Sequence, residues 1–338
     1  MALFDLPLSE LGQYRPQLPA PADFDEFWRR TLAGAREHSP LIDVRPVATA
    51  LTLVETFDVT FAGFDGQPIR AWYSRPAGFA NAALPAVVEY LGYGRGRGLP
   101  VDRLLWPCAG YVHLLMDSRG QGSQYGTGGH TPDPVGSDPA TPGVLTRGIR
   151  NPETAYLRRI VTDAARAVDA VAELPGVDLD RIAVVGNSQG GGLAIAAAAL
   201  NPRARALLAT VPFLCHIRRS MDITDAAPYA EIVQYLSVHR DAAADVTRSL
   251  GYFDGVHFAR RVGVPAQFAA GLRDTVCPPS GVFAAFNQLG ALAADDPARA
   301  TEMVVYPYNG HEHGDTVQAQ RQIDWLAGVF DVVRAAAA

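Results

Sequence analysis

The sequence predicts an α/β fold in which a mostly parallel β-sheet carries helices on both faces. Short apolar runs, such as 181–185 and 266–272, have the length of buried strands. Segments with apolar residues at helical spacing alternate with these runs, and turns rich in glycine and proline separate the two kinds of segment. The rhythm indicates one domain over residues 1–338.

The first half of the chain supplies four of the expected strands. Residues 1–50 form an amino-terminal extension punctuated by prolines, with one helix over 24–38. The strands are expected at 51–61, 67–74, 84–91 and 111–116. From 117 to 152 the chain is rich in Gly, Pro, Thr and Asp, which predicts a long loop with a functional role.

The second half alternates regularly except for one stretch. Further strands are expected at 181–185, 206–211, 266–272 and 303–306, and helices at 153–174, 191–200, 279–292 and 315–335. Residues 213–262 interrupt this rhythm with many charges and helical spacing. We interpret them as a helical insertion over the catalytic edge of the sheet rather than as a second domain.

Composition narrows the classes of function. The chain has 338 residues, of which 48% are hydrophobic and 19% charged, and its formal net charge is −6. A negative charge without any basic run argues against a nucleic-acid partner. The first seven residues lack the features of a signal peptide, and no apolar stretch is long enough to span a bilayer. We therefore expect a cytoplasmic protein without membrane contact.

The three cysteines give no sign of a disulfide framework or of a metal site. Cys108, Cys215 and Cys277 lie far apart and are odd in number. Free cysteines fit a reducing cytoplasm, and the chain shows no metal-ligand spacing. We expect no metal and no organic cofactor.

The motif at 186–190 is the strongest chemical signal in the chain. It reads Gly-Asn-Ser-Gln-Gly and stands between a predicted strand and a predicted helix. That context is the nucleophile elbow, in which a strained turn exposes the serine hydroxyl and flanking glycines let strand and helix approach. The alternative is a tight turn whose Ser188 only caps the helix.

A serine nucleophile needs a base, and the base needs an orienting acid. In α/β-hydrolases these follow the serine in the order acid, then histidine, each in a loop after a late strand. Asp274 and His311 occupy such positions, and the Asn-Gly turn before His311 would project it from the strand end. His313 is the competing histidine; Asp254 and Asp315 are the competing acids.

Two backbone N–H groups should form the oxyanion hole. The residue after the nucleophile, Gln189, supplies one. The second should come from the loop after an early strand, here Gly92-Tyr93-Gly94, and we choose Tyr93. The alternative for Tyr93 is an aromatic residue at a glycine turn without a special role.

Several motifs together resemble one family, carbohydrate esterase family 7, the acetyl xylan esterases and cephalosporin-C deacetylases. The resemblance rests on Arg119-Gly120-Gln121-Gly122, on the elbow at 186–190 and on His311-Glu312. Supporting stretches are 252–254 and 271–280, so that the similarity covers nearly the whole chain.

The resemblance implies an α/β-hydrolase that removes acetyl groups from small acetylated sugars and related esters. Ser188, Asp274 and His311 would be its triad, and Tyr93 its tyrosine oxyanion donor. Family members are commonly hexamers, so the resemblance also implies a homo-oligomer. The family usually has a histidine before the Gly-Tyr pair, where this chain has Leu91. The support of the loop and the polarity of the pocket could differ as a result.

The two remaining signatures suggest supporting roles. The guanidinium of Arg119 suits a carboxylate held by two hydrogen bonds, and Glu312 beside the catalytic histidine is a candidate partner. We hypothesise that an Arg119–Glu312 pair ties the long loop to the histidine loop. We expect Gln121 to satisfy backbone groups rather than to contact substrate.

Two rival functions stay open at this stage. One is a peptidase or a broader short-chain carboxylesterase on the same fold, because a fold does not determine its substrate. The other is a non-catalytic binding protein on a hydrolase scaffold. The complete set Ser188, Asp274 and His311 argues against the binding protein.

Overall fold

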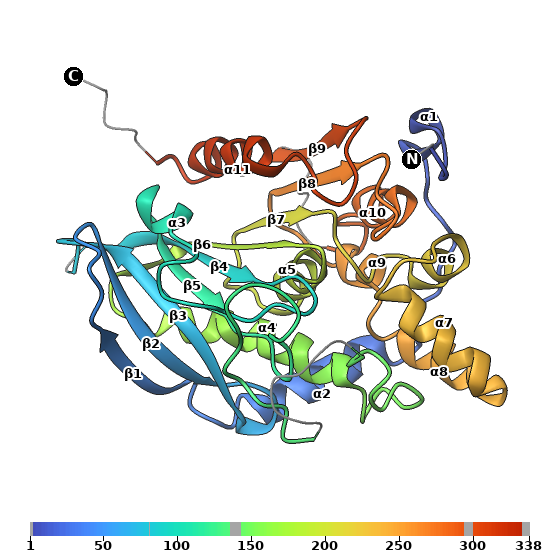
Figure 1. Cartoon of the computed structure of the whole chain (residues 1–338), viewed down its shortest axis with the longest axis horizontal. Helices are drawn as coiled ribbons and strands as arrows, with labels where there is room; N and C mark the ends of the chain where they lie inside the picture. The colour runs from blue at the N-terminus through green and yellow to red at the C-terminus, as the bar shows by residue number, and fades with distance from the viewer. Residues whose placement is uncertain (1–2, 81, 136–142, 294–299, 333–338) are drawn as a thin grey trace.

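The computed structural model describes residues 3–80, 82–135, 143–293 and 300–332. In this part of the chain nine strands form a single sheet in the order β1-β2-β3-β5-β4-β6-β7-β8-β9 (Figure 1). The strands from β5 to β9 in this order pair in parallel, and β1, β2 and β3 pair antiparallel at one side. The predicted α/β fold with a mostly parallel sheet is confirmed.

All eight predicted strands are present, with small shifts at their ends. The nine strands are β1 (Leu41–Val47), β2 (Val54–Ala62), β3 (Pro68–Pro76), β4 (Leu84–Tyr90), β5 (Val112–Met116), β6 (Val177–Asn187), β7 (Ala206–Thr210), β8 (Ala266–Gly271) and β9 (Thr301–Tyr306). The longest, β6, is the strand that leads into the elbow.

The predicted helices are also present, and several end earlier than expected. They are α2 (Phe24–Ala35), α4 (Tyr156–Ala172), α5 (Gln189–Leu200), α10 (Pro279–Phe286) and α11 (Asp315–Val329). Short helices α1 (Leu8–Leu11) and α3 (Leu105–Cys108) were not predicted. The expected end of the last helix, 333–335, lies outside the described residues.

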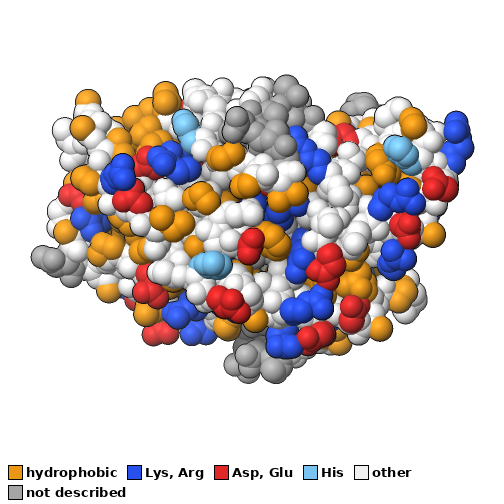
Figure 2. Space-filling model, turned by 90° about the horizontal axis from the view of Figure 1, so that it is seen from below, with side chains coloured by type: hydrophobic (Ala, Val, Ile, Leu, Met, Phe, Trp, Pro, Cys, Tyr) orange, Lys and Arg blue, Asp and Glu red, His pale blue; other side chains and the backbone are white. Residues whose placement is uncertain are grey.

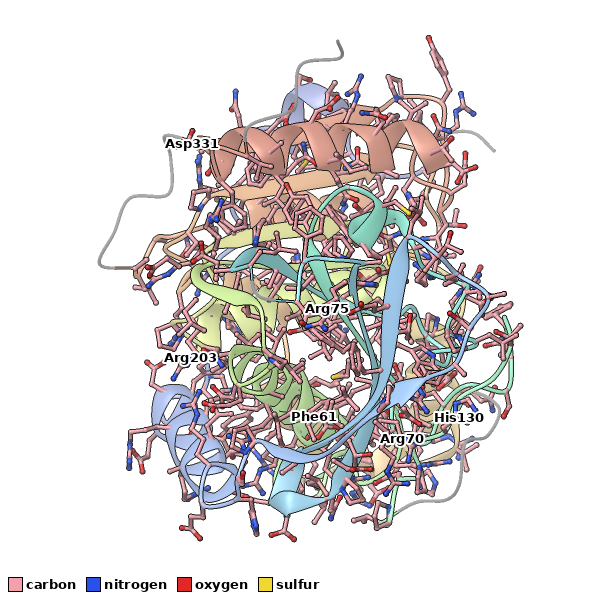
Figure 3. The ribbon with its side chains drawn as sticks, turned by 90° about the vertical axis from the view of Figure 1, so that its left-hand side faces the viewer. Phe61, Arg70, Arg75, His130, Arg203 and Asp331 are labelled. Carbon is pink, nitrogen blue, oxygen red and sulfur yellow. The ribbon has the colours of Figure 1, made fainter. Side chains whose placement is uncertain are left out.

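Alternation along the central strands divides the core between the two faces of the sheet. Ala86 and Val88 of β4 join a large cluster with α4 and α5, whereas Val87 between them joins a smaller cluster with Leu326 and Phe330 at the other face. Successive side chains of a strand point to opposite faces, so both faces are apolar and both need helices. In Figures 1 and 3, α11 lies on one side of the sheet, and α2 and α4 lie on the other.

The sequence missed strand β1 because Pro46 interrupts its pattern. Proline has no N–H to donate and is confined to edge strands, bulges and strand starts. The structure places β1 at the edge of the sheet, paired antiparallel with β2 alone. Part of the amino-terminal extension therefore widens the sheet.

Residues 213–262 carry four helices beyond the carboxyl ends of the parallel strands (Figure 1). These are α6 (Ile217–Ile223), α7 (Tyr229–Val238), α8 (Ala243–Leu250) and α9 (Gly255–Ala259). Helix α9 packs against α5 and α10. The insertion is thus joined to the core of the sheet domain at one end, while α7 reaches the edge where the loops after β4, β6 and β9 meet.

The described helices and one face of the surface bear on the expected partners. None of the described helices is both long and apolar enough to cross a bilayer. On the face in Figure 2, acidic and basic side chains are interspersed among isolated hydrophobic ones. Such a face gives no electrostatic footprint for a nucleic acid.

Candidate active site

Ser188 stands on a strained turn between β6 and α5. Its φ of 58° and ψ of −120° lie in a region that non-glycine residues seldom adopt. A Cβ on Gly190 would lie 2.1 Å from the Tyr90 carbonyl oxygen, and one on Gly186 would lie 2.2 Å from the Gly190 backbone. Both positions therefore require glycine, as the elbow interpretation expects.

The backbone around Ser188 is fixed from both sides. Its N–H donates to the carbonyl of Thr210 at 3.0 Å, and its carbonyl accepts from the N–H of Phe213 at 2.9 Å. Its side-chain oxygen lies 3.9 Å from Sγ of Cys277. The turn thus aims the hydroxyl toward the loop after β8, where Asp274 and Cys277 lie.

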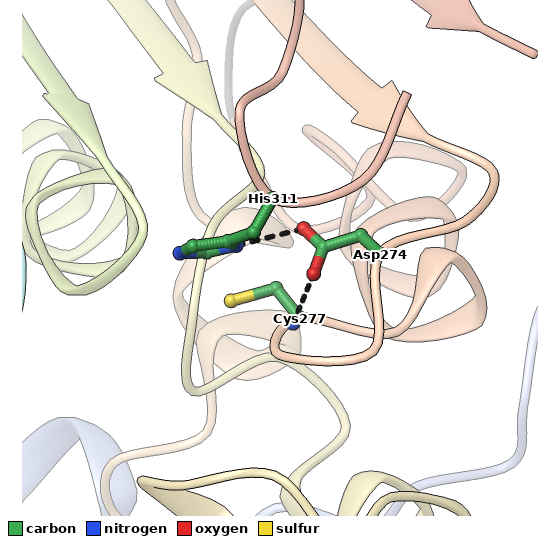
Figure 4. A group of neighbouring side chains, drawn as sticks. All are labelled: Asp274, Cys277 and His311. Atoms are coloured by element: carbon green, nitrogen blue, oxygen red, sulfur yellow. Dashed lines mark hydrogen bonds and ion pairs between the residues drawn. The ribbon is translucent and has the colours of Figure 1, made fainter. Parts of the chain in front are cut away.

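Asp274 and His311 form a hydrogen-bonded pair. Nδ1 of His311 lies 2.9 Å from Oδ2 of Asp274 (Figure 4). The other oxygen of the aspartate accepts from the N–H groups of Val276 at 2.8 Å and Cys277 at 2.9 Å. Asp274 is fully buried, whereas about a third of the His311 side chain is exposed. A carboxylate held at both oxygens can fix the orientation of the imidazole and leave Nε2 free.

Cys277 completes a group that could in principle hold a metal. Ligand atoms of Asp274, Cys277 and His311 all lie within 4.8 Å of one another (Figure 4). The oxygens of Asp274 face N–H donors, however, and burial raises the pKa of the Cys277 thiol well above its usual range. We therefore assign these groups to hydrogen bonding within the site.

Glu312 closes the turn that carries His311. Its carboxylate accepts from the N–H of Gly310 at 2.9 Å and from Nδ2 of Asn309 at 2.9 Å. Hydrogen bonds from backbone N–H groups, its own and that of Gly310, lower the pKa of Glu312. The glutamate therefore supports the histidine loop from within that loop.

The hypothesised Arg119–Glu312 pair is wrong. The guanidinium of Arg119 is fully buried and donates to both oxygens of Asp163, at 2.5 and 2.7 Å. Its remaining partners are Gln67 at 2.5 Å and Asp133 at 3.5 Å. Burial acts to lower the pKa of Arg119, but the carboxylates outweigh it and the net shift is upward. Arg119 thus ties the long loop to α4 in the interior.

Gln121 joins the two segments chosen for the oxyanion hole. Its Oε1 accepts from the N–H of Gly94 at 2.7 Å, and its Nε2 donates to Oε1 of Gln189 at 2.8 Å. The same Nε2 lies 2.8 Å from the Tyr156 hydroxyl. Gln121 therefore satisfies one backbone group, as expected, and also two side chains.

The side chain of Gln189 turns away from the nucleophile. Its Nε2 donates to the carbonyl of Leu91 at 3.2 Å. Gln189 is the first residue of α5, so its backbone N–H is among those without an intrahelical acceptor. Leu91 itself is buried, and it is not among the described residues that line the cavity.

A cavity of about 640 Å³ opens over Ser188. It is lined by Glu89, Tyr90, Gly92, Tyr93, Arg95, Arg103, Gln124, Tyr125, Asn187, Ser188, Ala227, Pro228, Glu231, Val276, His311, Glu312, His313 and Asp315. Tyr93, Ser188 and His311 of the predicted site thus share one cavity. Its size lies in the range of small-molecule sites.

The lining also holds polar residues that the sequence did not reveal. Glu89 of β4 contacts Arg103 at 2.6 Å and Nε2 of His113 at 3.0 Å. Glu231 comes from α7 in the insertion, where no spacing pattern marked it. Only the position of Glu89 one residue before the end of a strand could have signalled a place near the site.

His311 and its competitor His313 have different partners. His313 lies with Nε2 3.3 Å from Nδ2 of Asn187, and burial lowers its pKa. Of the competing acids, Asp254 accepts from the N–H of Val256 as the cap of α9, and Asp315 begins α11 and lines the cavity. Asp274 and His311 are thus the acid and histidine that the structure brings together.

Comparisons with known proteins point to one family of esterases. A model of the acetyl xylan esterase family matches residues 1–329. The acetyl esterase Axe7A of Xylanibacter ruminicola is 25% identical over 324 residues, covering 92% of this chain and 68% of that protein.

Two solved structures are similar over nearly the whole chain. An acetyl xylan esterase from Paenibacillus sp. R4 is 37% identical, with a TM-score of 0.85, and the match covers 96% of this chain and 99% of that one. Acetyl xylan esterase 1 from Thermoanaerobacterium sp. JW/SL YS485 is 33% identical, with a TM-score of 0.84 and a coverage of 97% and 100%.

Proposed function

The chain belongs to the acetyl xylan esterase family and is a carboxylic-ester hydrolase, and from this premise we propose that it deacetylates small acetylated xylo-oligosaccharides through an acetyl-serine intermediate. The observation that carries the proposal is the His311–Asp274 hydrogen bond beside a serine on a strained elbow. The three side chains follow parallel strands of one sheet, so that their loops meet at the same edge.

In the acylation step, the Ser188 hydroxyl attacks the acetyl carbonyl carbon. Nε2 of His311 takes the serine proton as the C–O bond forms, and Asp274 stabilises the imidazolium that results. The N–H groups of Tyr93 and Gln189 stabilise the negative charge on the carbonyl oxygen. When the intermediate collapses, His311 returns its proton to the departing sugar oxygen, which leaves as an alcohol.

The deacylation step repeats the same proton transfers with water. His311 removes a proton from water as the water attacks the acetyl group on Ser188. The collapse of this second intermediate breaks the bond to serine, returns the proton to its oxygen and releases acetate. The two steps together consume one water molecule, and Ser188 and His311 end in the protonation states in which they began.

The cavity supports a small substrate. A volume of about 640 Å³ accommodates a short oligosaccharide rather than a long polysaccharide chain. Cephalosporin C, which also carries an acetyl ester, is proposed as a second substrate on the family resemblance. We also propose, on the same resemblance, a homo-oligomer of six chains, which would restrict access to the cavity further; the mass in solution tests it.

The direct test replaces Ser188 by alanine. We expect Ser188→Ala to lower kcat for a chromogenic acetate ester and for acetylated xylose by a factor on the order of 10⁴ or more, with an unchanged unfolding transition. Retained turnover in the purified variant would overturn the proposal.

A series of acyl chains separates acetyl specificity from the rival activities. With an acetyl-specific site, kcat/KM should fall steeply beyond two or three carbons, because a longer acyl chain has to displace side chains that pack against the acetyl group. A flat series would indicate a broader carboxylesterase, and cleavage of an acyl-peptide at a comparable rate would indicate a peptidase.

A further inference from the structure

The Tyr93 hydroxyl lies in a polar cluster that the reaction itself does not use. It donates to Oε2 of Glu231 at 2.8 Å and accepts from the N–H groups of Gly143 at 3.0 Å and Val144 at 3.1 Å. Three segments far apart in the sequence therefore meet at one hydroxyl: the loop after β4, the end of the long loop and helix α7 of the insertion. All hydrogen-bonding positions of the phenol oxygen are used.

The loop that this hydroxyl anchors is a short turn, closed by a hydrogen bond from the N–H of Arg95 to the carbonyl of Gly92 at 3.2 Å. Tyr93 lies between two glycines, and Gly94 has a φ of +78°, which glycine adopts without strain. On the carboxyl side, the N–H of Gly94 is held by Oε1 of Gln121. The hydrogen bonds of the Tyr93 hydroxyl provide a further anchor. They hold the side chain and thereby the orientation of the Tyr93 peptide plane.

We propose that Glu231 is a positioning residue for the oxyanion hole, acting through the Tyr93 hydroxyl. This inference rests on the proposed function, since it assumes that the Tyr93 N–H stabilises the oxyanion. An oxyanion donor must lie about 2.7–3.1 Å from the developing charge, so a small rotation of a glycine-flanked peptide weakens it. The insertion thereby contributes to transition-state stabilisation as well as covering the cavity.

The geometry favours this role over direct contact with substrate. Glu231 lines the cavity, but its Oε2 already accepts from the Tyr93 hydroxyl. Burial raises the pKa of Glu231, while hydrogen bonds from Tyr93 and from the N–H groups of Leu145 and Gly143 act in the opposite direction. The Glu231 carboxylate therefore accepts hydrogen bonds from groups of the protein rather than from the substrate.

Three variants separate positioning from substrate contact. Glu231→Leu removes the acceptor, Glu231→Gln keeps an acceptor oxygen without the charge, and Tyr93→Phe removes the hydroxyl but keeps the backbone N–H. Gln234→Leu, at an exposed position of the same helix, is the matched control. Each is assayed for kcat and KM with the chromogenic acetate ester, and its unfolding transition is recorded.

We expect Glu231→Leu and Tyr93→Phe each to lower kcat by about 10- to 100-fold, less than the loss of a whole oxyanion donor, with KM changed by less than about threefold. Glu231→Gln should recover most of kcat, and Gln234→Leu should resemble the wild type. The double variant Tyr93→Phe with Glu231→Leu should lose little more than either single variant, since both act through one hydrogen bond.

Three results would overturn the inference. A rise in KM at unchanged kcat in Glu231→Leu would assign Glu231 to substrate binding, and additive losses in the double variant would show that the two side chains act independently. If Glu231→Leu does not fold, Glu231→Gln and Tyr93→Phe still test the hydrogen bond. Wild-type deacetylation tests the proposed function separately, so an active wild type with unaffected variants removes this inference alone.

Discussion

Nδ2 of Asn187 lies 3.3 Å from Nε2 of His313, so the residue before the nucleophile is joined to the loop that carries the catalytic histidine. His311, two residues earlier in that loop, is bound instead to Asp274. The two histidines therefore have separable roles, of which only His311 is oriented by a buried carboxylate.

This separation predicts unequal effects of two matched substitutions. His311→Gln should lower kcat by a factor on the order of 10⁴ or more, because the base is lost. His313→Gln keeps a side chain that can accept from Asn187 and should retain kcat within about tenfold. Steady-state kinetics with a chromogenic acetate measures both, and a larger loss in His313→Gln would reverse the assignment.

Asp274→Asn should lower kcat by about 10⁴-fold while the protein stays folded. An amide can turn its N–H₂ group toward Nδ1 of His311, which favours the wrong tautomer and does not stabilise the imidazolium. The N–H groups of Val276 and Cys277 can still donate to the amide oxygen. Near-wild-type turnover in this variant would exclude Asp274 as the orienting acid.

Arg119→Met should destabilise the protein without acting on the reacting groups. The substitution leaves the buried carboxylate of Asp163 without its cation, and breaking a buried pair costs about 3–5 kcal/mol. The exposed pair of Arg218 and Asp222 is the control, for which Arg218→Met should cost about 0.5 kcal/mol or less. Urea unfolding at neutral pH measures both, and equal losses would contradict the buried network.

His257 should make stability fall as the pH is lowered. Burial lowers its pKa to about 4, below the value of 6.5 that it has when unfolded. The unfolded chain then binds more protons between these values, so stability is complete above pH 6.5 and is lost toward pH 4, by about 3 kcal/mol at most. Burial raises the pKa of Asp254 to about 6, so this carboxyl changes the stability in the opposite direction. Asp254 is present in both the wild type and a His257 variant, so its effect cancels when the two are compared.

His257→Gln should therefore show a shallower loss of unfolding free energy between pH 6.5 and pH 4 than the wild type. Denaturant unfolding at several pH values in this window measures the difference. Parallel curves for the two proteins would contradict the assignment of this pH dependence to His257.

The sequence predicted the parts of the fold and the site that follow from local pattern. The buried runs at 181–185 and 266–272 were found as β6 and β8 because parallel strands buried on both faces are continuously apolar. The elbow was found because its glycines are required at a fixed spacing in the chain, two residues on either side of the serine. Asp274 and His311 were found because the carboxyl ends of parallel strands lie at one edge.

What the sequence did not reveal depends on distant contacts. Arg119 was given the wrong partner because Asp163 lies in the middle of helix α4. In the sequence, an aspartate within a helix cannot be told from one on the solvent-exposed face. Glu231 was missed because only the tertiary position of α7 brings it to the Tyr93 hydroxyl. Strand β1 was missed because Pro46 is tolerated only at an edge, and an edge is a property of the whole sheet.

The central claim is that Ser188 is the nucleophile, and labelling by a serine-reactive phosphonate followed by mass spectrometry of the peptides tests it most directly. The expected result is one phosphonyl group per chain, on Ser188, with activity lost in proportion to labelling and no labelling of Ser188→Ala. Full activity after labelling of Ser188, or inactivation with the label on another residue such as Cys277, would contradict it.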